Sequence, residues 1–308
     1  MLYDIYFHND FDGRASAAVM RYFLVRQGDT IGNYIPVNFD IGPRWAGLKF
    51  PNPAIIVDFI YHPKATWWFD HHRTSFTRAD WQKAFRKSRF LVWDKDYPSC
   101  CHLVIDYLKK NFGFTIPKHL KELARWLDVV DAAQFKSARQ TIEIKEPALQ
   151  LAAFIDRFGK GKESLAWLIE LLSEQSIEDV MKDARIKKMI GTIKADQKKS
   201  LAFYRKELAI SGKVAFMDFT AARVPELRFA PFFLYPKLTY GMVLKKSVKS
   251  YHLTLGINPW RRFASRLDIS ALLKKYGGGG HRYVGGVQIE TRAKAEKIIN
   301  ELLVFLNT

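Results

Sequence analysis

The sequence predicts an α/β protein: an N-terminal domain on a largely parallel sheet, a helical connector, and a smaller C-terminal α+β domain. In the first half, short apolar runs alternate with stretches that have the spacing of amphipathic helices, which is typical of a parallel sheet with crossover helices. A long charged stretch over 164–209 is interrupted by a single glycine and predicts further helices. With 308 residues, 48% of them hydrophobic, the chain can bury the cores of two domains.

Strand ends in the N-terminal half carry the polar residues that matter most. The predicted strands are residues 3–7, 54–57, 66–69 and 90–93. The predicted helices are residues 15–26, 100–111 and 119–132. Three of these strands run directly into acidic or imidazole residues: the polar loop 8–13, Asp58 and Asp70. Because open α/β sheets bind ligands at the carboxyl ends of their strands, we expect the functional site there.

The composition changes after residue 211, where a second set of strands begins. We therefore divide the chain into residues 1–185, a helical linker at 186–211, and a domain over 212–308. The strands predicted in this last domain are residues 214–217, 240–244, 251–256 and 284–289. Helices are predicted at 268–276, where Asp268 is the expected N-cap, and at 292–306. The run Gly277 to Gly280 ends the first of these helices.

The charge of the chain favours a polyanionic partner. Forty-nine Lys and Arg against 31 Asp and Glu give a net charge of +18, which attracts nucleic acid or polyphosphate over long range. Solubility, or a basic host proteome, is the alternative explanation. No apolar run is long enough to span a membrane, and the N-terminus lacks the pattern of a signal peptide. The adjacent Cys100 and Cys101 suit neither a disulfide framework nor a zinc site, so we expect a cytoplasmic protein without a membrane partner.

The loop His8-Asn9-Asp10-Phe11-Asp12-Gly13 is the first candidate metal site. Hard divalent ions such as Mn²⁺ prefer carboxylate oxygens with an occasional imidazole. Side chains two residues apart in an extended loop can converge if Gly13 lets the backbone turn. The alternative interpretation is that Asp10 and Asp12 are ordinary loop and cap residues.

The second cluster, Asp70-His71-His72, follows the strand at 66–69, and Asp58 follows the strand at 54–57. A surface pair of histidines and a helix-capping aspartate are the alternatives for each taken alone. Together, H-x-D-x-D-G, a strand-terminal Asp and D-H-H a dozen residues later resemble the signature of the DHH phosphoesterase superfamily. That superfamily includes RecJ-type exonucleases, nanoRNA and pAp phosphatases, cyclic-dinucleotide phosphodiesterases and family II inorganic pyrophosphatases.

Two further segments extend the resemblance over nearly the whole chain. The family's fourth motif is an aspartate often followed four residues later by an aromatic, a pattern that Asp131 and Phe135 match; Asp128, one turn earlier, is the substitute candidate. In the C-terminal domain, the glycine run followed by His281 resembles the GGGH motif of the DHH-associated substrate-binding domain. Glycines let backbone N–H groups approach a phosphate closely.

The resemblance implies a site with two Mn²⁺ ions, for which Mg²⁺ or Co²⁺ can substitute, sharing a bridging aspartate and a bridging water. The implied metal ligands are His8, Asp10, Asp12, Asp58, His71 and Asp131. Asp58 is the implied bridge, Asp70 orients a histidine, and His72 contacts the scissile phosphate or protonates the leaving oxygen. The implied substrate-binding residues are Gly278, Gly279, Gly280, His281, Arg282, Arg261 and Arg262. For the three arginines, the alternative interpretation is that their side chains are simply solvated.

One departure from the family pattern affects His8. Several subfamilies carry H-x-x-x-D-x-D, which requires an acid where this chain has Arg14. Asp10 offers the missing carboxylate, as in the RecJ-like form, and direct ligation by His8 therefore stays open.

We accordingly expect a metal-dependent nuclease that acts on short single-stranded oligonucleotides or a small nucleotide such as pAp. A polyphosphatase or pyrophosphatase-like activity is the enzymatic alternative, and a non-catalytic nucleic-acid-binding protein is the alternative of another class. The sequence leaves a homodimer open. Trp67, Trp68 and Trp93 lie in apolar runs, which favours core packing over base stacking.

Overall fold

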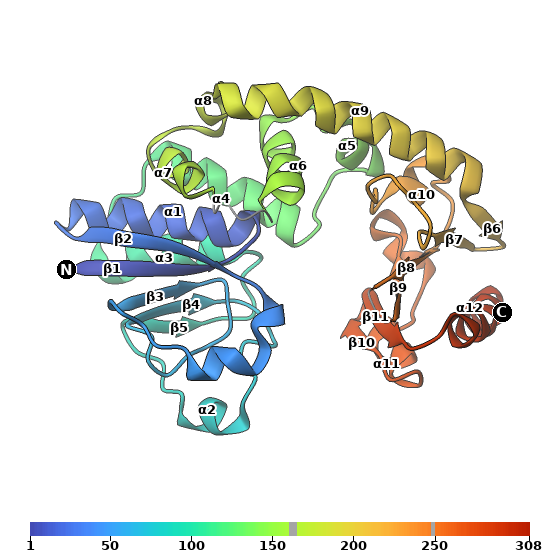
Figure 1. Ribbon diagram of the computed structural model, residues 1–308, viewed down its shortest axis with the longest axis horizontal. Coiled ribbons are helices and arrows are strands. Elements are labelled where there is room, and N and C mark those ends of the chain that lie inside the picture. The colour runs from blue at the N-terminus through green and yellow to red at the C-terminus, as the bar shows by residue number, and fades with distance from the viewer. Residues whose placement is uncertain (160–164, 248–249) are drawn as a thin grey trace. The chain divides into compact units, whose positions relative to one another are not determined.

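The computed structural model describes residues 1–159, 165–247 and 250–308 (Figure 1). The chain forms two compact units that are not contiguous in sequence. The first comprises Met1–Gln134 and Lys145–Ile190, and the second comprises Phe135–Ile144 and Gly191–Thr308. Most of the predicted linker at 186–211 belongs to one continuous helix, α9 (Ala184–Glu207). In the described part of the chain, no helix is both long enough and apolar enough to cross a membrane.

The first unit is built on a five-stranded sheet in the order β2-β1-β3-β4-β5. Its strands are β1 (Leu2–His8), β2 (Thr30–Val37), β3 (Ala54–Val57), β4 (Trp67–Asp70) and β5 (Leu91–Trp93). All four pairings are parallel. The register places Phe7 beside Val57, and Val57 beside Phe69. The residues that follow β1, β3 and β4 therefore emerge side by side at one edge of the sheet.

Helices and an aromatic cluster cover the two faces of this sheet. The helical segments of the unit are α1 (Phe11–Arg26), η1 (Phe39–Gly47), α2 (Ala79–Ala84), α3 (Cys100–Phe112), α4 (Lys118–Asp131), α6 (Pro147–Phe158), α7 (Ala166–Glu174) and α8 (Ile177–Val180). Helix α1 packs against α3 and α7 (Figure 1). On the other face, Tyr6, Trp45, Phe59 and Trp68 form a buried cluster. Trp67 and Trp68 are both buried, which confirms their predicted role in the core.

Helix α1 begins at Phe11, four residues before the predicted start. The reason is that Asp10 caps it: the Asp10 side chain accepts a hydrogen bond of 2.9 Å from the backbone N–H of Gly13. The extended loop predicted over residues 8–13 is therefore wrong in its second half. Asp12 and Gly13 lie in the first turn of a helix, whose positive end favours an aspartate.

The second unit has a six-stranded sheet in the order β10-β11-β9-β8-β7-β6. Its strands are β6 (Ala209–Ser211), β7 (Val214–Asp218), β8 (Tyr240–Lys246), β9 (Tyr251–Ile257), β10 (Gly279–His281) and β11 (Val284–Ile289). Apart from the parallel pair β7 and β8, the neighbours are antiparallel. The helical segments, besides most of α9, are α5 (Ala138–Glu143), α10 (Ala230–Leu234), η2 (Pro259–Ala264), α11 (Ile269–Lys274) and α12 (Arg292–Asn307). Asp268 caps α11, as predicted.

The glycine run of the second unit forms part of a hairpin. Gly279–His281 is strand β10, paired with β11, and no strand was predicted at this position. A Cβ on Gly278 would lie 2.5 Å from the carbonyl oxygen of Gly286, and one on Gly280 would lie 2.5 Å from the Cα of Gly285. The close approach of these backbones therefore requires glycine, independently of any ligand.

Candidate metal centre

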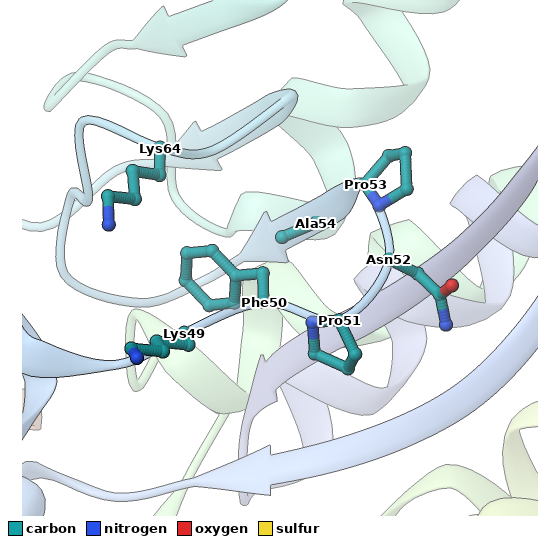
Figure 2. Close-up of a pocket in the computed structure, with 7 residues that line it drawn as sticks. All are labelled: Lys49, Phe50, Pro51, Asn52, Pro53, Ala54 and Lys64. Carbon is teal, nitrogen blue, oxygen red and sulfur yellow. The ribbon is translucent and has the colours of Figure 1, made fainter.

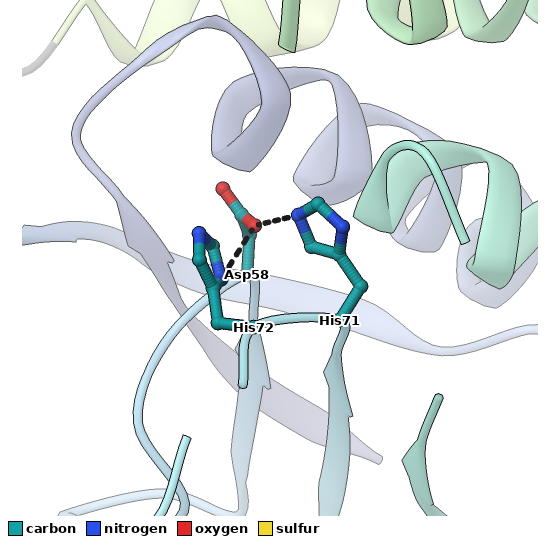
Figure 3. Close-up of side chains that lie close together, drawn as sticks. All are labelled: Asp58, His71 and His72. Atoms are coloured by element: carbon teal, nitrogen blue, oxygen red, sulfur yellow. Dashed lines mark ion pairs between the residues drawn. The ribbon is translucent and has the colours of Figure 1, made fainter. Parts of the chain in front are cut away.

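Asp58 lies at the centre of the polar residues gathered at the edge of the first sheet. It follows β3 with a left-handed backbone (φ 57°), a conformation that aspartate tolerates better than most residues, and it is only 1% exposed. Its Oδ1 is 3.5 Å from His71 Nε2 and 3.6 Å from His72 Nδ1, the two contacts drawn in Figure 3. Its Oδ2 is 3.7 Å from His8 Nδ1. The two oxygens of one carboxylate thus face two different sets of side chains.

His71 presents Nε2 to three carboxylates. Its other nitrogen, Nδ1, is 3.0 Å from the backbone carbonyl of Tyr97, and a carbonyl can only accept, so Nδ1 carries the hydrogen. Nε2 is 3.6 Å from Asp12 Oδ2, 3.5 Å from Asp58 Oδ1 and 3.4 Å from Asp131 Oδ2. It is buried without a hydrogen bond of good geometry. Burial alone would lower the pKa of His71, but these carboxylates, Asp58 foremost, raise it to about 10.

Asp12 is held in place by the start of α3. Its carboxylate oxygens accept the backbone N–H groups of Cys100, at 2.6 Å, and Cys101, at 3.0 Å. These are the first residues of α3, whose N-terminus favours an anion. Even so, burial and then the charges of Asp58 and Asp131 raise the pKa of Asp12 well above its usual range. The carboxylate is therefore fixed in place but short of positive charge.

His8 and Asp10 form a pair on the other side of Asp58. Asp10 Oδ2 is 2.8 Å from His8 Nδ1, while Asp10 Oδ1 caps α1. Burial would lower the pKa of His8, but the contacts with Asp10 and Asp58 raise it to about 10. Gly13 is required here, since a Cβ at this position would collide with the backbone of His8.

The end of α4 carries both candidates for the fourth motif, and the geometry separates them. Asp131 joins the cluster through His71, and burial together with the charge of Asp58 raises its pKa to about 6. Asp128 is engaged elsewhere. It accepts a hydrogen bond of 2.7 Å from Ser99 Oγ and lies 2.7 Å from His102 Nδ1, which ties α4 to the start of α3.

Asp70 is fully buried and orients the residues that follow it. Its Oδ1 is 2.8 Å from His72 Nδ1 and accepts the backbone N–H of His71 at 2.8 Å. Its Oδ2 accepts the hydroxyl of Ser75. Burial would lower the pKa of His72, and the contact with Asp70 more than offsets this and raises it. His72 therefore has a fixed ring, with Nδ1 committed to Asp70 and Nε2 left for a ligand.

The arrangement fits divalent cations. The side chains offer three groups of ligand atoms, and within each group the atoms lie within 4.8 Å of one another. The groups are Asp58 with His71 and His72, Asp58 with His8 and Asp10, and Asp12 with His71 and Asp131. Ligand atoms that sit about 2.1 Å from one ion at right angles are about 3 Å apart, close to the spacings observed here. Both oxygens of Asp58 are buried without a hydrogen bond of good geometry. Burial would raise the pKa of Asp58, but His71 and His8 hold it far below its usual range.

The hollow shown in Figure 2 is a different feature. It has a volume of about 380 Å³ and is lined by residues 49–54 together with Lys64. Ala54 begins β3, whereas Asp58 follows the end of the same strand. The hollow therefore lies at the opposite edge of the sheet from the cluster and includes none of its residues.

The predicted substrate-binding residues all lie in the second unit. Arg261 and Arg262 belong to η2, and the guanidinium of Arg262 is 4.6 Å from the centre of the Tyr283 ring. Arg282 approaches the same ring at 5.7 Å. Gly278 precedes β10, and Gly279 and Gly280 lie in it. The side chain of His281 is outside the described part of the structure.

Three partners of the cluster, Tyr97, Ser75 and Ser99, belong to no motif of the sequence. Tyr97 and Ser75 lie in loops and contact His71 and Asp70 only through the tertiary fold. Ser99 is the N-cap of α3, and a serine directly before a helix is a signal that the sequence can give. The contact of Ser99 with Asp128, 29 residues away, has no such signal in the sequence.

Comparison with known proteins gives similarity at the level of structure. No protein-family model matches the chain, and no curated protein matches it in sequence. A pGpG-specific phosphodiesterase from Vibrio cholerae matches with a TM-score of 0.76 and 20% identity, over 99% of each chain. RecJ in complex with Mn²⁺ from Thermus thermophilus matches with a TM-score of 0.55 and 13% identity, over 99% of this chain and 52% of RecJ. An exopolyphosphatase-related protein from Bacteroides fragilis matches with a TM-score of 0.54 and 12% identity, over 99% of this chain and 92% of that one. These likenesses confirm the predicted α/β fold.

Proposed function

We propose that this chain, which has the fold of the DHH superfamily, is a divalent-metal-dependent phosphoesterase acting on short oligonucleotides or a small nucleotide such as pAp. The observation that best supports this is the environment of His71. Its Nδ1–H is committed to a carbonyl, and its Nε2 faces three carboxylates at 3.4–3.6 Å. Such an arrangement needs a positive charge among the carboxylates, which the protonated His71 supplies without metal and a divalent cation would supply in its place. A metal-ligating histidine commonly donates its other N–H to a backbone carbonyl in this way.

The charges of the cluster support two ions. Four carboxylates, those of Asp10, Asp12, Asp58 and Asp131, belong to the ligand groups. When ionised they carry four negative charges, which two divalent cations neutralise, whereas one would leave two charges uncompensated. Asp58 belongs to two of the groups and would be shared. Carboxylate and imidazole donors suit Mn²⁺, with Mg²⁺ or Co²⁺ as substitutes.

The chain's own residues have separable roles in this proposal. Bound cations would neutralise charge on the phosphoryl oxygens and make a water molecule acidic enough to attack near neutral pH. His72, held at Nδ1 by Asp70, would turn Nε2 toward the substrate and hold a proton for the leaving oxygen. Asp12, which lies in the first turn of α1 and accepts the first N–H groups of α3, would hold the starts of these two helices together beside the site.

One observation favours a nucleotide substrate: the structure matched at a TM-score of 0.76 is named as a phosphodiesterase specific for pGpG, a linear dinucleotide. The net charge of +18 suits any polyanion, nucleic acid and polyphosphate alike. The likeness to an exopolyphosphatase-related protein favours inorganic polyphosphate as a second candidate. A non-catalytic nucleic-acid-binding role is the third, and it does not account for the clustered ligand atoms.

The test is hydrolysis by the full chain with Mn²⁺, using 5′-labelled RNA of two to about twenty nucleotides, a linear dinucleotide, pAp and polyphosphate. We expect release of mononucleotides from the shortest substrates. Asp58→Ala and His71→Ala should abolish turnover with an unchanged circular dichroism spectrum. The matched control is Asp94→Ala, because Asp94 also follows a strand of the sheet but belongs to none of the ligand groups.

Each outcome is decisive for one part of the proposal. Full activity in Asp58→Ala or His71→Ala would refute the metal centre. Release of phosphate from polyphosphate, with no turnover of the nucleotides, would establish polyphosphate hydrolysis as the function instead. Binding of RNA without turnover of any substrate, in a protein that holds Mn²⁺, would establish the non-catalytic role.

A further inference from the structure

Phe39 is an exposed aromatic side chain at the rim of the metal cluster. It follows β2 and begins η1, and it is 48% exposed. Its ring centre is 5.0 Å from that of His8 and 6.3 Å from that of His72, in edge-on arrangements. The Phe59 ring supports it at 5.2 Å. The ring is thus fixed from the side of the cluster and still open to solvent.

This exposure contrasts with the other aromatic side chains on the same face of the sheet. Trp45, Phe59 and Trp68 are buried in the cluster beneath it. Phe90, the other exposed phenylalanine of the first unit in the described residues, precedes β5 and packs against Trp67, at the opposite edge of the sheet. A single exposed aromatic is ordinary in itself. Phe39 differs because it contacts two of the clustered histidines.

We propose that Phe39 is a stacking platform for the nucleobase adjacent to the scissile phosphate, which makes it a specificity-determining residue for base-bearing substrates. This inference rests on the proposed function. A phosphate bound through cations at Asp58 would lie beside His72, whose ring centre is 6.3 Å from that of Phe39. A base joined to that phosphate through one sugar would then come within reach of the Phe39 ring. Aromatic side chains bind bases of any sequence, because every base has a π-face.

The proposal narrows the substrate class. A base-binding surface beside the metals would favour nucleotides over polyphosphate, which has nothing to stack. Because stacking discriminates weakly among bases, purine and pyrimidine dinucleotides should both be substrates. The competing explanation is that Phe39 only packs on His8 and keeps its ring in place. That role would affect every substrate equally, with or without a base.

The experiment compares a linear dinucleotide with its abasic analogues, in which one base at a time is replaced by hydrogen. Stacking on one aromatic side chain is worth about 1–3 kcal/mol, so Phe39→Ala should raise KM for the dinucleotide about 5- to 150-fold. Its kcat should change little. For one abasic analogue, wild type and variant should have equal KM values. Phe39→Trp should keep a KM close to that of wild type, whereas Phe39→Leu should raise KM as Phe39→Ala does. Phe90→Ala is the matched control and should behave as wild type.

Equal losses on the dinucleotide and on all its abasic analogues would overturn the proposal, as would full rescue by Phe39→Leu. Failure of the proposed function is recognised separately, because wild type would then hydrolyse neither substrate. In that case the Kd of the dinucleotide decides, measured by calorimetry for wild type and Phe39→Ala. A weaker Kd in the variant, with no change for the abasic analogue, would sustain the stacking role, and equal Kd values would refute it.

Discussion

Replacing Asp131 with asparagine should stabilise the metal-free protein while weakening its metal centre. In the fold, burial and the charge of Asp58 raise the pKa of Asp131 to about 6, against about 3.9 in an unfolded chain. The folded state therefore holds this proton more tightly than the unfolded state. Linkage then makes the free energy of unfolding fall as the pH rises from about 4 to about 6, and the loss persists at higher pH.

The size of the effect follows from the shift and the exposure. A difference of about two pKa units corresponds to about 3 kcal/mol. The Asp131 side chain is 31% exposed, so solvent screens much of this and about 1 kcal/mol is the expected net value. The variant carries a neutral amide at every pH. We therefore expect Asp131→Asn to be about 1 kcal/mol more stable than wild type at pH 7.5, and equally stable below about pH 4.

The assay is urea unfolding at pH 7.5 and at a pH just below about 4, first with EDTA and then with a fixed excess of Mn²⁺. With metal the order should reverse, because wild type gains stability from binding to the folded state and the variant, which has lost one carboxylate ligand, gains less. Two results would refute the reasoning: a variant less stable than wild type in EDTA at pH 7.5, or a variant that gains as much from Mn²⁺ as wild type does.

Three further predictions follow from the same cluster. His8 and His71, with pKa values raised to about 10, are protonated without metal at pH 7.5. If both ligate, Mn²⁺ binding should release at least about two protons, because the raised pKa of Asp12 can only add to the count; calorimetry in buffers of different ionisation enthalpy measures this number, and no release would contradict the prediction. Asp70→Asn frees the His72 ring and should lower kcat about 10- to 100-fold with little change in KM; an unchanged kcat would remove Asp70 from its orienting role. Asp128→Asn should lower the free energy of unfolding by about 1–3 kcal/mol without changing Mn²⁺ affinity, and a lost metal site would show that Asp128 is a ligand.

The strands that carry the site could be predicted almost residue by residue. The strand over Ala54–Val57 has the predicted bounds, because a short, wholly buried apolar run between polar residues leaves little choice of register. Strand β2 was missed. It pairs only with β1, is mostly not buried, and contains Gly32 and Pro36, which edge strands tolerate and which weaken the alternating pattern. Helix α6 was missed as well, although Pro147 in its first turn is a start signal.

The grouping of the site residues could be anticipated from the sheet, but their second partners could not. Parallel strands bring the residues after β1, β3 and β4 to one edge, whatever the details of packing. The hydrogen bond of His71 to the Tyr97 carbonyl, and that of Asp12 to the start of α3, join segments 26 and 88 residues apart. No local pattern encodes such contacts. They depend on where α3 packs against the sheet and α1.

Arg14 stands where several subfamilies of the DHH superfamily, which this sequence resembles, carry an acid, and its placement shows how the cluster forms without one. The side chain is fully buried and turns to the backbone behind the cluster, where its guanidinium donates to the carbonyl oxygens of Asp10 and Gly159, each at 3.0 Å, and to the Asn9 side chain. It thereby fixes the main chain of Asp10, whose carboxylate then meets His8 at 2.8 Å. A carboxylate two residues after the histidine takes the place of one six residues after it. Because Arg14 holds the loop instead of facing the ligand atoms, substituting it would act on the site through the backbone of that loop, which carries Asp10.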